Sequence, residues 1–209
     1  METVYVITHP EATHHVENLV GGWYDSELTE RGHRQAEQIA RHLREVIPAD
    51  VTPQLVTSDL RRTSQTADAI AQVFGIEPEV NADLREKSYG AAEGKPQAWL
   101  DERFVFPPAY PATPDERMDH DEGIPGAETK LQWVQRTYRA VAQIEETAAS
   151  HRIIVTHGGT ANWVIAAWQR IPVEGCGYVG WRLAQGSITT LSDANPFHNR
   201  TLLSLGVIP

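Results

Sequence analysis

The chain has 209 residues, of which 41% are hydrophobic, and a formal net charge of −10 at pH 7. These values suit one α/β domain with a sizeable core and exclude a disordered or fibrous chain. No apolar run approaches the length of a membrane-spanning helix, and an acidic chain without a basic stripe is a poor partner for nucleic acid. The single Cys176 excludes an internal disulfide framework, so we expect a cytoplasmic protein without a signal peptide.

The first part of the chain alternates strand-like and helix-like segments. Residues 3–8 are a β-branched run typical of a buried strand, and Thr29 is a good N-cap for a helix that ends at Pro48. The expected elements are, in order, a strand over 3–8, a helix over 30–47, a strand over 54–58, a helix over 59–74 and a short strand over 77–80.

The pattern dissolves between residues 87 and 127, where prolines stand among acidic and aromatic residues. It resumes with a long helix expected over 128–149, a strand over 152–156 and a helix that stops before Pro172. Two or three strands in "GSITTLS" and "TLLSLGV" close the chain. Because long irregular segments in compact domains are often functional, we expect residues 96–126 to form a cap or lid; an open surface loop is the alternative.

This alternation predicts a three-layer α/β/α sandwich around a mainly parallel sheet, with at least one antiparallel edge strand and residues 1–209 forming a single domain. In such sheets ligands bind beyond the carboxyl ends of the strands. A Thr-His dipeptide follows two of the expected strands, which places His9 and His157 at that edge.

Five segments resemble the histidine phosphatase superfamily, whose members include phosphoglycerate mutases. They are "ITHPE" (7–11), "TSDLRRTSQTA" (57–67), "LREKSYGAAEG" (84–94), "GAET" (126–129) and "VTHGG" (155–159). The resemblance spans nearly the whole chain in the family's order. It implies the phosphoglycerate mutase-like α/β/α fold and hydrolysis of phosphomonoesters through a phosphohistidine.

The resemblance also assigns roles to individual residues. His9 matches the nucleophile, which accepts the phosphoryl group and releases it to water. Arg62 matches the arginine of the second segment, and its planar guanidinium suits bidentate contact with phosphate. His157 matches a second donor, and Gly158 behind it lets the start of the next helix approach the anion. Glu86 matches the general acid, with Glu93 as the rival carboxylate.

The first motif departs from the family, which normally has Arg-His-Gly where this chain has Thr8-His9-Pro10. Loss of a charge-assisted donor from a phosphoryl site lowers the rate on the order of a hundredfold or more. Thr8 offers one neutral hydroxyl, and His15 stands near the place of the family's phosphate-binding asparagine. We expect Thr8 and His15 to contact the phosphate, with His14 and Arg85 as further compensating donors.

Three interpretations therefore stay open. The chain is a phosphatase of altered substrate range, or a superfamily member with phosphomutase or non-phosphatase acid–base activity, or a non-catalytic anion-binding module. The shorter chain favours hydrolysis over the mutase reaction. Aromatic residues of the 96–126 segment favour a substrate body larger than glycerate; they are Trp99, Phe104, Phe106 and Tyr110.

The expected partner is a small, anionic, phosphorylated substrate, without nucleic acid or membrane, and a homodimer stays open. The resemblance implies no cofactor and no metal. A metal site of His9, Glu11, His14 and His15 is the competing interpretation of the histidine-rich loop. It is disfavoured because adjacent histidines diverge on an extended chain and metal ligands need fixed outer partners.

Overall fold

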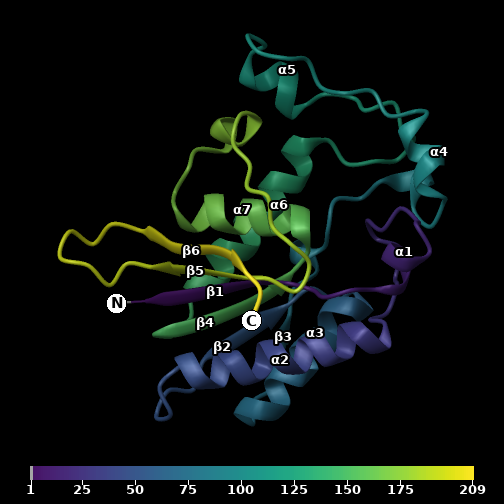
Figure 1. Ribbon diagram of the computed structural model, residues 1–209. Helices are drawn as coiled ribbons and strands as arrows, with labels where there is room; N and C mark the ends of the chain where they lie inside the picture. The colour runs from purple at the N-terminus through teal and green to yellow at the C-terminus, as the bar shows by residue number, and fades with distance from the viewer. Residues whose placement is uncertain (1) are drawn as a thin grey trace.

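The computed structural model describes residues 2–209, which contain a six-stranded sheet in the order β3-β2-β4-β1-β5-β6 (Figure 1). The strands are β1 (Thr3–Thr8), β2 (Gln54–Thr57), β3 (Glu79–Val80), β4 (His151–Thr156), β5 (Ile188–Ser192) and β6 (Thr201–Val207). The first four are parallel to one another, whereas β5 runs antiparallel to both β1 and β6. The mainly parallel sheet is thus confirmed, but the antiparallel strand lies one place inside the edge, because β6 pairs beyond it.

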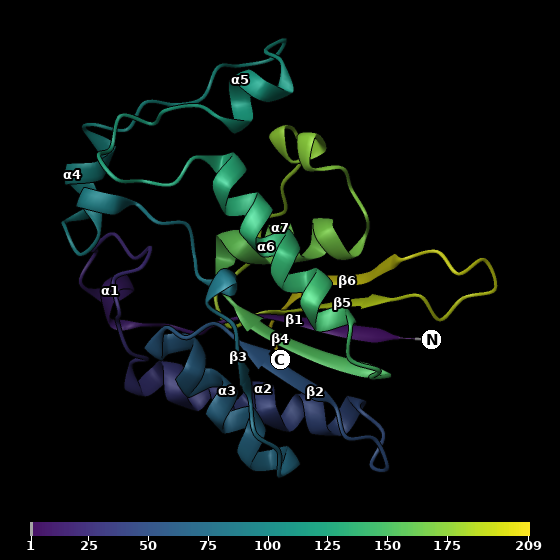
Figure 2. The ribbon, with the colours of Figure 1, turned by 180° about the vertical axis from the view of Figure 1, so that it is seen from behind.

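Helices cover both faces of this sheet, which confirms the three-layer architecture (Figures 1 and 2). One face carries α2 (Glu30–Val46) and α3 (Arg61–Phe74), and the other carries α6 (Lys130–Glu145) and α7 (Gly158–Trp168). The shorter elements are α1 (Thr13–Val16), α4 (Gln97–Asp101), α5 (Pro114–Met118) and the 3₁₀ turns η1 (Ala82–Leu84), η2 (Gly90–Ala92) and η3 (Val173–Gly177).

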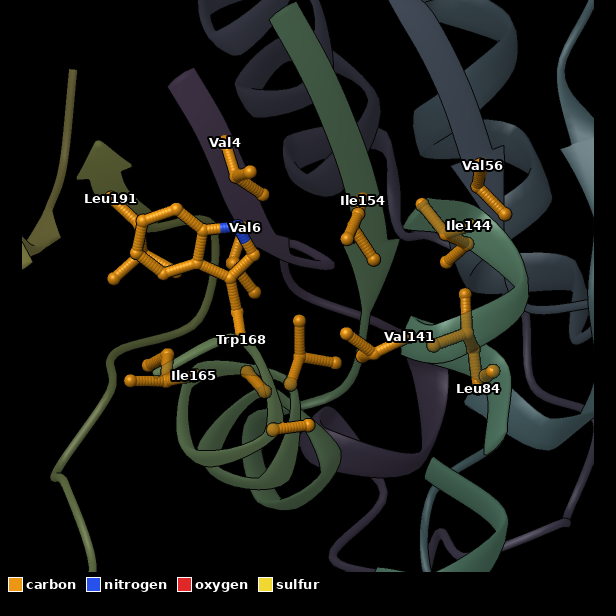
Figure 3. Packing of buried hydrophobic residues seen from close by; sticks show 14 residues of the cluster. Val4, Val6, Val56, Leu84, Val141, Ile144, Ile154, Ile165, Trp168 and Leu191 are labelled. Atoms are coloured by element: carbon orange, nitrogen blue, oxygen red, sulfur yellow. The ribbon is translucent and has the colours of Figure 1, made fainter. Parts of the chain in front are cut away.

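Side-chain alternation along β1 divides the core into two layers. Val4 and Val6 pack toward α6 and α7, in the cluster around Trp168 that Figure 3 shows. Tyr5 and Ile7 point to the opposite face and pack with α2 and α3. A strand buried on both faces must be apolar at every position, which explains why this segment is a continuous β-branched run.

The helix boundaries follow local capping chemistry. The Thr29 side chain accepts a hydrogen bond from the Gly32 N–H at 3.0 Å, so the expected N-cap is confirmed. The helix expected over 128–149 is shorter, since Thr129 caps it and it ends at Glu145. The four-residue helix α1 was not anticipated, because one turn is too short to produce a periodic pattern.

The segment expected as a cap extends beyond α6 and α7 on the side away from the sheet (Figure 1). Leu100 packs with Val20 and Ile124, and Trp99 and Phe104 are partly buried against this group. Phe106 and Tyr110 are 79% and 84% exposed. Within residues 2–209, no helix is long and apolar enough to cross a membrane.

Candidate functional site

The register of two neighbouring strands brings His9 and His157 together. β1 and β4 pair with Thr8 opposite Thr156, and the His9 N–H donates to the Thr156 carbonyl at 3.0 Å. The two imidazoles consequently leave the sheet at the same level, with ring centroids 5.2 Å apart and planes at 71°. By strand alternation both rings turn toward the face that α3 covers.

Arg62, in the first turn of α3, completes this arrangement. Its side chain is 1% exposed, and its Nε donates to His9 Nε2 at 3.2 Å. Its terminal nitrogens donate to the carbonyl oxygens of Gly22 and Tyr24 at 2.6 and 2.7 Å. Burial lowers the pKa of Arg62 to about 10, which leaves the guanidinium charged at neutral pH.

The protonation state of His9 is fixed by its own loop. Its Nδ1 lies 2.8 Å from the Pro10 carbonyl oxygen, which can only accept, so Nδ1 carries the proton and Nε2 carries the lone pair. Burial and then the Arg62 charge hold the pKa of His9 well below its ordinary value of 6.5. His9 is therefore a neutral imidazole whose unprotonated Nε2 accepts a hydrogen bond from Arg62 Nε.

Helix α1 places two further imidazoles beside His9. His15 stacks on His9 with centroids 5.5 Å apart, and its Nδ1 accepts from the Ala12 N–H at 3.0 Å, which leaves the proton on Nε2. His14 Nδ1 lies 2.6 Å from Ser26 Oγ. Burial, as the largest cause, lowers the pKa of His14 to about 3 and that of His15 to about 4. These three rings, two of them buried and that of His15 partly exposed, thus form a neutral cluster beside one cation.

His157 is fully buried and has one nitrogen without a partner. Its Nε2 lies 3.0 Å from Ser58 Oγ, whereas its Nδ1 makes no hydrogen bond to any residue in the 2–209 range. Burial lowers the pKa of His157 well below its ordinary value. Ser58 lies within the second family-like segment, but its contact with His157 could not be found from the sequence, because it joins residues 99 positions apart.

Glu86 lies at the N-terminus of α7. Its carboxylate accepts hydrogen bonds from the N–H groups of Gly159 at 2.9 Å and Thr160 at 3.1 Å. Arg136 supports the same loop through the Glu86 carbonyl, at 2.7 Å, and pairs with Glu128. The sequence did not indicate this role for Arg136, since a helical arginine is usually solvated.

The rival carboxylate and two expected donors are engaged elsewhere. Glu93 accepts from Ser88 Oγ and the Tyr89 N–H, both at 2.9 Å, and does not line the cavity that Glu86 lines. The Thr8 hydroxyl donates to the Ala184 carbonyl at 2.6 Å and accepts from the Ser187 N–H at 3.0 Å. Arg85 pairs with Asp59, with its Nε 2.7 Å from the carboxylate. Thr8 therefore holds the 184–187 turn to β1.

A cavity of about 420 Å³ opens onto His9, Arg62 and Glu86, whereas His157 is not among the residues that line it. It is also lined by Thr8, His14, His15, Gly158 and Gly159. The other lining residues are Leu19, Val20, Gly21, Gly22, Tyr89, Gln97, Leu100, Trp133, Leu183 and Gln185. From the segment 96–126 only Gln97 and Leu100 reach the cavity. In residues 2–209, no group of three or more His, Cys, Asp or Glu side chains is arranged to hold a metal ion.

We predict that Gly159→Ala lowers kcat, whereas Gly158→Ala has a much smaller effect. A Cβ at position 159 would lie 2.5 Å from both Glu86 Oε1 and Trp133 Cη2, whereas a Cβ at position 158 meets nothing within 4 Å. Displacing Glu86 by a fraction of an ångström should cost about tenfold to a hundredfold in rate. The two variants change helix propensity equally, so matching kinetics and matching thermal stability would contradict the close approach.

Comparison with known proteins places the chain among phosphatases and mutases. The profile of the histidine phosphatase superfamily (branch 1) matches residues 4–200. A Klebsiella pneumoniae protein named "Probable phosphoglycerate mutase" is 33% identical over 161 residues, covering 76% of this chain and 70% of that protein. An Arabidopsis thaliana phosphoglycerate mutase-like protein is 31% identical over 159 residues, covering 75% and 66%.

Two solved structures share the fold over nearly their whole length. A mycobacterial glucosyl-3-phosphoglycerate phosphatase, in complex with VO₃, superposes with a TM-score of 0.78 at 25% identity, covering 99% of this chain and 100% of that one. The alpha-ribazole phosphatase of Shigella flexneri gives a TM-score of 0.77 at 23% identity, covering 98% and 96%. The second likeness concerns the fold alone.

Proposed function

The chain belongs to the histidine phosphatase superfamily, and from this premise we propose that it hydrolyses phosphomonoesters through a phosphohistidine on His9 Nε2. The observation that carries the proposal is the orientation of His9. Its Nδ1–H donates to the Pro10 carbonyl, and its unprotonated Nε2 lies 3.2 Å from Arg62 Nε, within the lining of the cavity. A neutral imidazole held in one tautomer beside a cation is a prepared nucleophile for an anionic phosphorus centre.

In the first step of the proposed reaction, the Nε2 lone pair of His9 attacks phosphorus, the N–P bond forms and the bond to the ester oxygen breaks. Negative charge on the equatorial oxygens requires donors that are already in place. We assign this role to the Arg62 guanidinium, the His15 Nε2–H and the Gly158 N–H. With Ser58 donating to Nε2 of His157, the unpartnered Nδ1–H of that ring is a further donor.

In this proposal Glu86 acts first as the general acid and then as the general base. In its protonated form it donates to the leaving ester oxygen, and its carboxylate then removes a proton from the attacking water. The water oxygen bonds to phosphorus, the N–P bond breaks, and its electron pair returns to His9 Nε2 as inorganic phosphate leaves. Contacts with Gly159 and Thr160 hold the carboxyl group at the cavity wall through both steps.

The missing arginine of the first motif does not remove the basis for catalysis. His15 stacks on the nucleophile and presents Nε2–H without a charge, so we propose it as the main replacement for the lost donor. Thr8 is a weaker candidate, since its hydroxyl proton is engaged by Ala184. Restoring the charge by Thr8→Arg tests this assignment, and we expect a higher kcat on simple phosphomonoesters.

The relatives carry names of both phosphatases and mutases, and we propose hydrolysis because the solved relative at 25% identity is a phosphatase. We further propose that residues 96–126 act as a cap, that the reaction needs no added metal, and that the protein works in the cytoplasm. The test is release of inorganic phosphate from p-nitrophenyl phosphate and a phosphomonoester panel, with EDTA present and with glycerol as a competing acceptor. Phosphate release supports hydrolysis, transfer to glycerol in preference to water indicates a mutase-type reaction, and no turnover by folded protein contradicts the proposal.

A further inference from the structure

The charges that line the cavity balance one another. Among the lining residues in the 2–209 range, Arg62 is the only arginine or lysine and Glu86 is the only carboxylate. The lining imidazoles of His9, His14 and His15 are neutral near pH 7, because burial lowers their pKa values. The cavity thus offers one cation to an anionic ligand, and that cation contacts the nucleophile itself.

Two buried cations beside cavity-lining residues are already paired. Lys87 forms an ion pair with Glu122, and its ammonium lies 5.0 Å from the Tyr89 ring centroid. Arg136 pairs with Glu128 at 2.7 Å. Neither cation lines the cavity. Since each faces its own carboxylate, neither is free to meet a second anionic group on a ligand.

Apart from Arg62, Glu86 and the three imidazoles, the residues that line the cavity are apolar or uncharged. Leu19, Val20, Leu100 and Leu183 supply aliphatic surface. The indole N–H of Trp133 is taken by Thr160 Oγ1 at 2.8 Å, so this residue presents only its ring to the cavity. A carboxylate on the ligand would lose its water and meet no cation among these residues, which is unfavourable.

We infer that the organic part of the substrate is an uncharged group, such as a neutral alcohol, and that phosphorylated carboxylic acids are discriminated against. This inference rests on the proposed function and specifies the substrate class of the same site. The phosphate meets Arg62 and the imidazoles, while the rest of the molecule meets the leucine-lined walls. A carboxylate there would also lie near Glu86 without a compensating charge.

Two matched substrate pairs test the inference. Glycerol 3-phosphate and 3-phosphoglycerate differ in a hydroxymethyl group against a carboxylate, and benzyl phosphate and 4-carboxybenzyl phosphate differ in one remote carboxylate. For each pair that is hydrolysed, we expect kcat/KM to be at least about tenfold higher for the member without the carboxylate. Equal values, or a preference for the carboxylate, would overturn the inference.

A second measurement distinguishes failure of the proposed function from failure of the substrate-class inference. If neither pair is hydrolysed, the binding of benzylphosphonate and 4-carboxybenzylphosphonate is compared by calorimetry with the same unmodified protein. Preferential binding of benzylphosphonate, which lacks the carboxylate, would uphold the ligand class while the hydrolase proposal fails. Equal binding, weak or strong, would overturn the ligand class as well.

Two variants test which side chains determine the discrimination against a substrate carboxylate. Gln185 lines the cavity and is exposed, so Gln185→Arg adds a cation at the rim without burying one. We expect the ratio of kcat/KM for the carboxylate substrate to that for the neutral one to rise by about tenfold. Arg182 is exposed and does not line the cavity. If the protein preferred the carboxylate substrate and Arg182→Gln abolished that preference, Arg182 would be the side chain that binds the carboxylate. This result would refute the inference.

Discussion

Replacing His9 by Gln should lower kcat/KM for phosphomonoester hydrolysis by about 10⁴-fold or more, because this removes the only atom that we propose to bond to phosphorus. Glutamine keeps a polar side chain of similar size, and its carbonyl oxygen can accept from the Arg62 Nε–H that His9 Nε2 now accepts. The fold should therefore survive. The measurement is steady-state hydrolysis of p-nitrophenyl phosphate, with thermal unfolding of both proteins as a check on folding.

His15→Gln is the matched control for this substitution. His15 belongs to the same stacked cluster, but we assign to it only a hydrogen bond to the phosphate. We expect a loss of about tenfold to a hundredfold, which is the effect of one donor rather than of the nucleophile. If His9→Gln lost no more activity than His15→Gln, the nucleophile would have been assigned wrongly.

The free energy of unfolding should fall as the pH drops from 6.5 to about 5, by roughly 3 kcal/mol from His14 and His15 alone. His9, His14, His15 and His157 are held neutral in the folded state, with His14 and His15 at pKa values of about 3 and about 4. Each of them returns to its ordinary value of 6.5 on unfolding. A proton taken up only by the unfolded state costs about 1.4 kcal/mol per pH unit.

The sign follows from which state binds protons. Below pH 6.5 the unfolded chain protonates these four imidazoles while the folded chain does not, so stability rises with pH in this window and is lost as the pH falls. The loss levels off only when the folded pKa values are reached, near pH 4 for His15 and near pH 3 for His14. A fall of this size is a large fraction of the stability of a typical domain.

Urea unfolding at a series of pH values measures this effect. His15→Gln should reduce the pH dependence by about one proton, whereas His33→Gln, at an exposed position on α2, should leave it unchanged. Stability that is flat between pH 6.5 and 5 would mean that the folded cluster takes up protons over the same pH range as the unfolded chain. That result would contradict a cluster that is held neutral in the folded state.

The parts of the site that depend on regular secondary structure could be predicted from sequence. A β-branched run followed by Thr-His places a histidine at the carboxyl end of a strand, and parallel pairing brings two such ends to one edge. The resemblance to the family identified Arg62, and its position agrees with this geometry, because a helix that returns antiparallel to its strand begins beside that edge. These rules are geometric and need no knowledge of side-chain packing.

Contacts between loops could not be predicted in the same way. The Thr8 hydroxyl was expected at the phosphate, but it bonds to Ala184, which is 176 residues away in the chain. Arg85 was expected as a further donor, but its guanidinium pairs with Asp59 and lies 4.8 Å from the centre of the Trp23 ring. Such pairings depend on where irregular segments cross, and neither composition nor periodicity records this.

The aromatic residues of the 96–126 segment illustrate the same limit. Their number indicated an apolar cap, yet Phe106 and Tyr110 are exposed and the cavity receives Leu100 and Gln97 from this segment. Most of the apolar lining comes from outside this segment, from Leu19, Val20, Leu183 and Trp133. The aromatic content of the segment therefore did not identify the apolar side chains that line the cavity.

The most direct test of this account is to trap the phosphoenzyme and determine which nitrogen carries the phosphoryl group. Protein mixed with a phosphomonoester is quenched in alkali, digested and analysed by mass spectrometry and ³¹P NMR. The account predicts one acid-labile phosphoryl group on the peptide that contains His9, attached to Nε2, because Nδ1 is engaged by the Pro10 carbonyl. Attachment to Nδ1 or to another residue, or turnover with no trapped intermediate, would contradict it.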